Sequence, residues 1–198
     1  SLGMAKYDAM KFTELGKQIT KPVGCANCHE ANSMKLIVTN PALEEALKAQ
    51  GKDWKTFTRQ EMRSVVCANC HVEYSFAGDG KYLTFPWKYG TTIEAIEKFY
   101  EENQFIDWKH ADSGTNMVKL QHPDYELFTA ESTHYKAGVA CADCHMPYTK
   151  VGAYKVSNHR VTSPLKTDLR ACVQCHSESA DWLRAQVEAI QDRKYCKL

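Results

Sequence analysis

The sequence predicts a mainly α-helical fold that contains much irregular chain, and three observations predict it. Apolar residues recur at helical spacing in several stretches, whereas clear strand signals are scarce. The longest helical pattern lies near the C-terminus, over residues 178–194. The pattern Cys-x-x-Cys-His occurs four times, with first cysteines separated by 42, 74 and 31 residues. These unequal spacings argue against any longer repeat, and we expect residues 1–198 to form a single domain.

The four motifs have the residue pattern to which c-type haem is attached. They are Cys25-Ala26-Asn27-Cys28-His29, Cys67-Ala68-Asn69-Cys70-His71, Cys141-Ala142-Asp143-Cys144-His145 and Cys172-Val173-Gln174-Cys175-His176. Both thiols form thioethers with the haem vinyl groups, and the adjacent histidine ligates iron. Zinc ribbons and redox disulfides also use Cys-x-x-Cys, but neither requires histidine directly after the second cysteine. The sequence therefore predicts a multihaem cytochrome c fold with four haems, whose large apolar plates form the core.

Local signals place the elements of the first half. Residues 4–18 carry apolar residues at roughly helical spacing, and Pro22 and Gly24 break the chain before the first motif. Pro41 suits a first helical turn after Asn40, so we expect a helix over 42–50 that ends at Gly51. A further helix over 56–66 leads into Cys67.

Shorter elements follow, with one long helix at the end. We expect a turn at 78–80, a short strand or extended loop over 82–85 and an amphipathic helix over 91–103. An irregular segment over 107–121 and a helix from Pro123 to about Ser132 should follow. We expect a loop between the third and fourth motifs. One face of the 91–103 helix carries Ile93, Ile96, Phe99 and Tyr100. The C-terminal helix, 178–194, has an apolar stripe formed by Trp182, Leu183, Val187 and Ile190.

The composition narrows the environment. Eight of the nine cysteines lie in the motifs, which leaves Cys196 and no disulfide framework. A net charge of +1 gives no sign of a nucleic-acid surface. No apolar run approaches the roughly 18 residues of a membrane span, and no signal peptide is visible. Because haem is attached covalently outside the cytoplasm, we expect a periplasmic protein, either processed or cut from a longer chain.

The histidines define the iron ligands. His29, His71, His145 and His176 follow the motifs and are predicted proximal ligands. Four more remain, His110, His122, His134 and His159. If each of these completed a bis-histidine iron, every haem would be closed to substrate and the protein would be an electron carrier. His134 and His159 are well placed to reach a neighbouring haem, whereas Pro123 restricts His122 to extended backbone beside Gln121.

Several segments together resemble the ammonia-forming pentahaem cytochrome c nitrite reductase family. They are Cys67-x-x-Cys-His71-Val-Glu-Tyr74, Phe85-Pro86-Trp87, Asp107-Trp108, Lys119-x-Gln121-His122-Pro123 and Cys141-Ala-Asp-Cys-His-Met-Pro147, in family order. Ser75 departs from the aromatic residue of the family. The resemblance implies that the four motifs are the haems that follow the catalytic one. That haem uses a Cys-x-x-Cys-Lys motif, which is absent here, as are counterparts of the active-site arginine and of the C-terminal stretch. We therefore expect a central piece, truncated at both ends.

The resemblance also implies an activity, the six-electron reduction of nitrite to ammonium. Nitrite would bind through nitrogen to the open iron, and Tyr74 and His122 would hydrogen-bond its oxygens and help to deliver protons. Calcium would bind Glu73, Gln121 and the backbone carbonyls of Tyr74 and Lys119.

The same family pattern assigns the remaining ligands and the partners. His134 would be the distal ligand of the Cys172/Cys175 haem and His159 that of the Cys25/Cys28 haem, with His110 unassigned. The expected partners are nitrite, a membrane-anchored or soluble cytochrome c electron donor, and a second copy of the chain bound through the C-terminal stripe. The alternative hypothesis is a tetrahaem periplasmic electron-transfer cytochrome. A Cys-x-x-Cys-Lys motif upstream of Ser1 would favour the enzyme, and a signal peptide ending there would favour the carrier.

Overall fold

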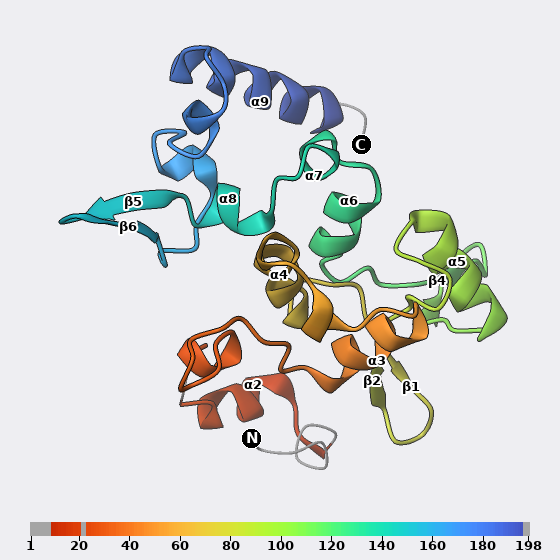
Figure 1. The fold of residues 1–198 in the computed structure, drawn as a ribbon. Coiled ribbons are helices and arrows are strands. Elements are labelled where there is room, and N and C mark those ends of the chain that lie inside the picture. Colours follow the sequence, from red (N-terminus) through yellow and green to blue (C-terminus); the bar gives the residue numbers. More distant parts are fainter. Residues whose placement is uncertain (1–8, 21–22, 196–198) are drawn as a thin grey trace. The chain divides into compact units, whose positions relative to one another are not determined.

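A computed structural model describes residues 9–20 and 23–195 of the chain. The chain forms two compact units, residues 1–132 and 133–198 (Figure 1). Within the described residues, no helix combines the length and the apolar character that a membrane crossing requires. The mainly helical class predicted from the sequence is confirmed, and the helices alternate with long irregular segments.

In the described part of residues 1–132, the first helices lie within or next to the stretches that the sequence predicts to be helical. The described part of the predicted 4–18 helix forms α2, Phe12–Leu15, and a 3₁₀ turn, Gly16–Gln18, whereas Met4, Tyr7 and Pro22 lie outside the described residues. Helix α3, Pro41–Ala49, begins with an N-cap in which the Asn40 side chain accepts a hydrogen bond from the Ala42 N–H. Helix α4, Arg59–Val65, begins with a reciprocal capping box between Thr58 and Glu61.

The side-chain core of this unit lies against the second haem motif. Helices α3 and α4 contribute Leu43, Leu47, Met62 and Val65, and all four are buried. The same cluster contains Ala68 and Val72 from the motif and its continuation, and Phe85 and Trp87 from the chain after the first hairpin. The core therefore fixes the backbone on both sides of Cys70 and His71.

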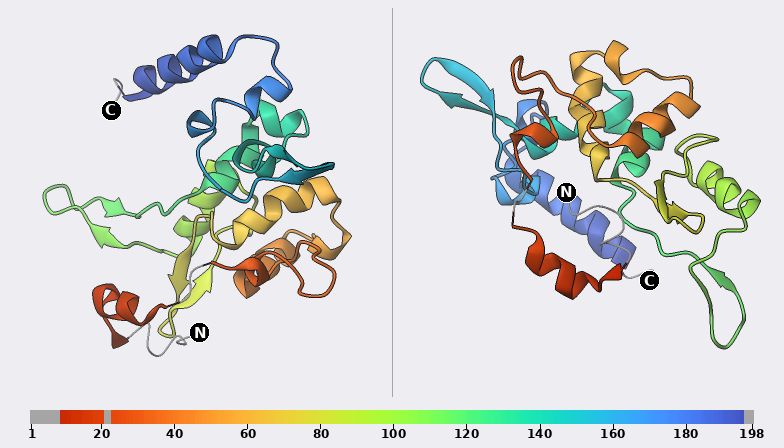
Figure 2. Two further views of the ribbon diagram at one scale, coloured as in Figure 1. Left: turned by 90° about the vertical axis from the view of Figure 1, so that its left-hand side faces the viewer. Right: turned by 90° about the horizontal axis from the view of Figure 1, so that it is seen from below.

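The rest of this unit contains two short antiparallel ribbons and two helices. Strand β1, Ser75–Ala77, pairs with β2, Tyr82–Thr84, so the strand alternative for 82–85 is the correct one. Helix α5 spans Ile93–Glu102, but Ile93 itself is 68% exposed, because it is the first residue after the cap and only Ile96 and Tyr100 reach the interior. The segment expected to be irregular contains a short ribbon, β3 (Trp108–Lys109) with β4 (Asn116–Met117), which extends away from α5 (Figure 2). Helix α6, Asp124–Glu131, starts where Pro123 predicted.

Residues 133–198 contain the third and fourth motifs. Helix α7 spans Thr133–Lys136, α8 spans Cys141–His145, and 3₁₀ turns lie at Pro164–Lys166 and Cys172–Gln174. The expected loop between the motifs is wrong in part, because Tyr148–Val151 (β5) and Tyr154–Ser157 (β6) form a hairpin. Its two-residue turn starts at Gly152 with φ 58°, and glycine at that position is typical of a type II′ turn.

The predicted C-terminal helix is present as α9, Ala180–Tyr195 (Figures 1 and 2). It begins after Ser179, whose hydroxyl accepts a hydrogen bond from the Trp182 N–H. Of the predicted apolar stripe only Leu183 is buried, while Trp182 and Ile190 are about half exposed, at 51% and 49%. The stripe is thus mostly unburied within this chain.

Candidate haem and substrate site

The four Cys-x-x-Cys-His motifs adopt tight helical turns. In the first, second and fourth motifs, the histidine N–H donates to the carbonyl of the first cysteine at 2.8, 2.9 and 2.9 Å. The third motif is the short helix α8. None of the eight motif cysteines is in a disulfide. Each turn therefore presents two thiols and an imidazole from one short stretch of backbone, which is what thioether attachment and proximal ligation require.

The second variable residue of each motif stabilises its turn. These polar residues are Asn27, Asn69, Asp143 and Gln174, and each side chain bonds to nearby backbone. Asn69 reaches further, because its Oδ1 also accepts the N–H groups of Thr39 and Asn40, both at 3.0 Å. The second motif is thereby tied to the start of α3. Sequence reasoning treated these positions as variable and missed this role.

Three of the four motif histidines form a hydrogen bond through their Nδ1 atoms. His29 Nδ1 lies 2.7 Å from the Met34 carbonyl oxygen, and His145 Nδ1 lies 3.0 Å from that of Thr162. His71 Nδ1 lies 2.9 Å from Asp124 Oδ2. Because these oxygens only accept, Nδ1 carries the proton and Nε2 keeps the lone pair that binds a metal. His176 differs, since its Nδ1 is 3.8 Å from Glu178 Oε2, which is an ion-pair distance and not a hydrogen bond.

The motif cysteines approach one another within each unit. Burial raises the pKa of the Cys28 thiol, and the nearby thiols of Cys70 and Cys25 raise it further. Burial likewise raises the pKa of Cys144, with Cys172 the next cause. The first and second motifs are therefore neighbours in residues 1–132, and the third and fourth are neighbours in residues 133–198. Haems attached to neighbouring motifs would lie close enough to exchange electrons.

The remaining histidines fall into distinct environments. The rings of His134 and His176 have centroids 6.1 Å apart. With about 2 Å between a metal and an imidazole nitrogen, two axial imidazoles on one ion would have centroids about 6 Å apart. His159 Nδ1 lies 3.0 Å from the Ser157 carbonyl oxygen, the same kind of Nδ1 contact that His29 and His145 make.

His110 has the opposite arrangement. Its Nδ1 accepts the N–H groups of Asp112 and Ser113, both at 3.3 Å, so the ring caps the turn between β3 and β4. The proton of the neutral ring then lies on Nε2, and this tautomer does not offer Nε2 as a ligand. The unassigned histidine of the sequence thus has a local structural role.

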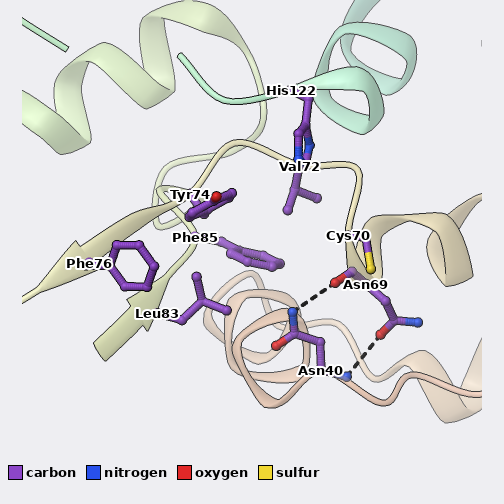
Figure 3. Close-up of a pocket in the computed structure, with 9 residues that line it drawn as sticks. All are labelled: Asn40, Asn69, Cys70, Val72, Tyr74, Phe76, Leu83, Phe85 and His122. Atoms are coloured by element: carbon purple, nitrogen blue, oxygen red, sulfur yellow. Dashed lines mark hydrogen bonds between the residues drawn. The ribbon is translucent and has the colours of Figure 1, made fainter. Parts of the chain in front are cut away.

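Tyr74 and His122 line one pocket of about 330 Å³ (Figure 3). Their ring centroids are 6.1 Å apart. The other lining residues are Asn40, Asn69, Cys70, Val72, Phe76, Leu83 and Phe85. The pocket is thus mainly apolar, with a phenol and an imidazole on its wall and the second cysteine of the second motif beside them. The two predicted catalytic residues are 48 positions apart in sequence, and the fold brings them together.

Four hydrogen bonds join residues 71–74, which begin with the histidine of the second motif, to the segment 121–126. Glu73 Oε2 accepts the Gln121 N–H at 2.8 Å, and Glu126 Oε1 accepts the Glu73 N–H at 2.9 Å. The other two bonds are Tyr125 N–H to the His71 carbonyl, 3.1 Å, and His71 Nδ1 to Asp124, 2.9 Å. These bonds set the separation of Tyr74 and His122.

Two carboxylates of this junction are buried. Glu73 is 0% exposed and Glu126 is 1% exposed. Glu73 Oε1 accepts the hydroxyl of Tyr100 at 2.8 Å, and burial raises the pKa of Glu73, to which the charge of Asp107 adds. Burial raises the pKa of Glu126 to about 7. Burial and the bond to Glu73 also raise the pKa of Tyr100, which keeps this phenol protonated as a donor.

The donors near Glu73 suit a hard cation. Besides Glu73, the predicted calcium ligands Lys119 and Gln121 lie on the facing segment, where the Lys119 N–H donates to Asp107 Oδ2 at 2.7 Å. Glu73 and Asp107 bring two carboxylates near each other, and a divalent cation there would offset the negative charge that burial disfavours. Sequence reasoning missed Tyr100 and Glu126, because no motif marks them.

The turns, thiols and metal-competent imidazoles together define a multihaem c-type cytochrome, with four cysteine pairs suited to four haems. The chain belongs to the cytochrome c552 family, whose model matches residues 1–197. Cytochrome c-552 of Parabacteroides distasonis is 49% identical over 193 residues, covering 98% of this chain and 39% of the relative. Cytochrome c-552 of Aliarcobacter butzleri is 41% identical over 201 residues, covering 97% of this chain and 40% of the relative.

A solved structure agrees with the fold. The chain matches cytochrome c nitrite reductase from Desulfovibrio desulfuricans with a TM-score of 0.79 and 41% identity, covering 86% of this chain and 39% of that one. The structure of that protein's catalytic subunit contains two calcium sites. The predicted family and the multihaem fold are therefore confirmed. This chain spans about two fifths of the length of these relatives.

Proposed function

We propose that this chain is the part of an ammonia-forming cytochrome c nitrite reductase that contributes four haems and one wall of the substrate site. The observation that carries the proposal is the convergence of Tyr74 and His122 on one pocket beside Cys70. The reaction is NO₂⁻ + 6 e⁻ + 8 H⁺ → NH₄⁺ + 2 H₂O, so the site must supply both electrons and protons. The family likeness and the solved nitrite reductase support this assignment.

The haems supply the electrons, and the side chains of this chain handle the substrate oxygens and the protons. The phenol of Tyr74 and the imidazole of His122 donate hydrogen bonds to the oxygens of nitrite and hold it in one orientation. As each oxygen leaves as water, the same groups pass protons to it. The sequence of this chain contains no Cys-x-x-Cys-Lys motif, so the iron that binds nitrite nitrogen belongs to a haem held outside these residues.

His29, His71, His145 and His176 would each ligate the iron of the haem attached to the cysteines of the same motif. His134 would be the second ligand of the Cys172/Cys175 haem, and the 6.1 Å separation of its ring from that of His176 supports this pairing. His159 is a second distal ligand, supported by its Nδ1 bond to Ser157. Such bis-histidine haems carry electrons and do not bind substrate.

Calcium binds beside the substrate residues, to Glu73, Gln121 and the carbonyls of Tyr74 and Lys119. The buried charge of Glu73 and the nearby Asp107 support the site. Substituting Glu73→Gln should therefore remove bound calcium, measured by elemental analysis of dialysed protein. The matched control is Glu97→Gln on the exposed face of α5. Unchanged calcium content in Glu73→Gln would rule out this ligand set.

The partners follow from the same assignment. Nitrite is the substrate, and a membrane-anchored or soluble cytochrome c in the periplasm supplies the electrons. A second copy of the chain covers the exposed part of the α9 stripe, where Trp182 and Ile190 stay accessible. Dimer contact there predicts weaker self-association in Val187→Glu, measured by sedimentation.

The experiment that tests the function compares His122→Ala with His110→Asn in the complete protein that contains this chain. Ammonium production is measured with a dithionite-reduced dye as donor. Loss of proton and hydrogen-bond assistance should lower turnover by about 10²–10⁴ in His122→Ala. His110→Asn keeps an acceptor in the β3–β4 turn and should retain turnover. The 198-residue chain alone should take up electrons without forming ammonium. An unimpaired His122→Ala would show that the site is misassigned.

One observation favours a second function, a tetrahaem electron-transfer cytochrome. The ring of His122 has its centroid 5.7 Å from that of His71, close enough for both to ligate one iron. In that case the His71 haem would lose a ligand in His122→Ala, and its ferric spectrum would change from low spin to high spin. Under the enzyme assignment His122→Ala leaves every haem of this chain low spin.

A further inference from the structure

The first turn of helix α6 contacts residues 71–73, the histidine of the second haem motif and the two residues after it, through three consecutive residues. Asp124 bonds to the His71 ring, the Tyr125 N–H donates to the His71 carbonyl, and Glu126 accepts the Glu73 N–H. The helix begins directly after His122 and Pro123. The element that follows one catalytic residue therefore holds the backbone that precedes the other.

Glu126 is the buried member of this contact. Its side chain is 1% exposed, and its Oε1 accepts two hydrogen bonds, from the Glu73 N–H at 2.9 Å and from the Trp87 indole N–H at 2.6 Å. Trp87 is itself fully buried and stacks on Tyr125, with centroids 5.3 Å apart. One oxygen thus joins three segments of the chain, namely the segment after the second motif, the Phe85–Trp87 segment and α6.

A carboxylate in this place needs an explanation beyond packing. Burying an ionisable group is costly, and an apolar residue of similar volume would fill the same space more cheaply. The second oxygen, Oε2, is buried and has no hydrogen-bond partner among the described residues. The useful property of the side chain is consequently the reach of one acceptor oxygen to the Glu73 N–H.

We propose that Glu126 is a positioning residue for the Tyr74–His122 site. Its Oε1 holds the Glu73 backbone against α6, which fixes Tyr74 on one side of Glu73 and the His71 carbonyl on the other. The substrate consequence rests on the proposed nitrite reductase function. The effect on the orientation of the His71 ring does not rest on that function, because it concerns only the haem attached to the second motif of this chain.

Two substitutions distinguish the effect of the length of the Glu126 side chain from the effect of its negative charge. Glu126→Gln keeps an acceptor oxygen at the same distance from the backbone and removes the charge. Glu126→Asp keeps the charge and shortens the side chain by one methylene, so that the oxygen no longer reaches the Glu73 N–H. Glu131→Gln, exposed on the same helix, is the matched control. All variants are made in the complete haem-loaded protein.

Two measurements are needed. The first is nitrite turnover. The second is the electron paramagnetic resonance signal of the low-spin ferric His71 haem, whose g values depend on the orientation of the axial imidazole ring. Partners that orient metal-site residues are typically worth about 10–100-fold in activity, and we expect a loss of that size in kcat for Glu126→Asp. The resonance of that one haem should shift in Glu126→Asp. Glu126→Gln should keep a kcat close to that of the parent, since its acceptor is preserved.

The outcomes separate this proposal from the proposed function. If the parent protein forms no ammonium, the function is wrong, and the shifted resonance of Glu126→Asp still supports positioning. If Glu126→Asp keeps both parental turnover and the parental resonance, the positioning role is wrong. Equal losses in Glu126→Gln and Glu126→Asp would show that an acceptor oxygen at the right distance is not sufficient and that the carboxylate itself is needed, which also overturns the proposal. If Glu126→Asp does not fold, Glu126→Gln alone decides, because a loss of turnover or a shifted resonance there contradicts the acceptor role.

Discussion

The two compact units hold their haem motifs in different ways. In residues 1–132, His71 is anchored by Asp124, a side chain 53 positions away, and a cluster of buried side chains packs around the second motif. In residues 133–198, His145 is anchored by a backbone carbonyl 17 positions away, and the Nδ1 atom of His176 lies 3.8 Å from Glu178. The buried apolar residues of the second unit are few, including Ala140, Leu169 and Leu183.

This difference indicates that haem takes the place of a side-chain core mainly in the second unit. A domain as small as the second unit buries little apolar surface by itself, and domains of that size usually need an added staple. Four covalent cysteine bonds to two haems would supply it. The first unit has a side-chain core in addition to its haems, and the proposed substrate residues lie beside that core. Precise placement of Tyr74 and His122 is easier where the surrounding backbone is packed.

The largest expected effect is the response of the second unit to loss of haem. Substituting Cys141, Cys144, Cys172 and Cys175 together by Ala prevents both attachments. We expect residues 133–198 to lose protection from hydrogen exchange, because the chain alone has too little core to remain folded. Residues 38–87 should keep their protection, as measured by mass spectrometry of peptides. Equal protection of both units in this variant would show that the second unit does not depend on its haems.

A second prediction concerns the packed region of the first unit and its dependence on pH. Burial raises the pKa of Glu126 from its ordinary 4.5 to about 7, so the folded state binds this proton more tightly than the unfolded state. The contribution to stability is therefore full below pH 4.5 and is lost as pH rises towards 7, with an upper limit of about 3 kcal/mol.

Glu126→Gln has no proton to lose, so its stability should fall less between pH 4.5 and pH 7 than that of the parent. Thermal unfolding of the first unit at both pH values, followed by circular dichroism, measures the difference. Glu131→Gln, whose carboxyl is exposed, should follow the parent. Parallel pH profiles for Glu126→Gln and the parent would mean that the pKa of Glu126 is not raised in the folded state.

The smallest expected effect is a change in haem reduction potential when the carboxylate beside a proximal histidine is removed. Asp124 bonds to His71 at 2.9 Å, whereas Glu178 is 3.8 Å from His176. A carboxylate on Nδ1 makes the imidazole a stronger donor and favours ferric iron, so removing it should raise the reduction potential. If that bond is worth about 1 kcal/mol, Asp124→Asn should raise the potential of the His71 haem by about 40 mV. Glu178→Gln should change that of the His176 haem by less, as measured by redox titration. A larger shift in Glu178→Gln would reverse the comparison.

Much of the fold could be predicted because its determinants are local. Asn40 and Pro41 mark the start of α3, and the Thr58–Glu61 pair marks that of α4, since caps act within one turn. The hairpin at 148–157 could have been found from Gly152 between two β-prone runs. The exposure of Ile93 could not have been predicted from the sequence. Helical periodicity assigns Ile93 to the apolar face of α5, but it does not show how much of that face the neighbouring chain covers.

The sequence by itself determined the chemistry of the chain, because haem attachment needs five consecutive residues and four such motifs are present. It also identified Tyr74 and His122, through the segments that resemble a known family. Only the tertiary structure brought these two residues to one pocket and gave Asp124, Glu126 and Trp87 their roles. The physical reason is distance along the chain. Glu73 and Glu126 are 53 positions apart, and a hydrogen bond between them exists only after the core of α3, α4 and Phe85–Trp87 has packed.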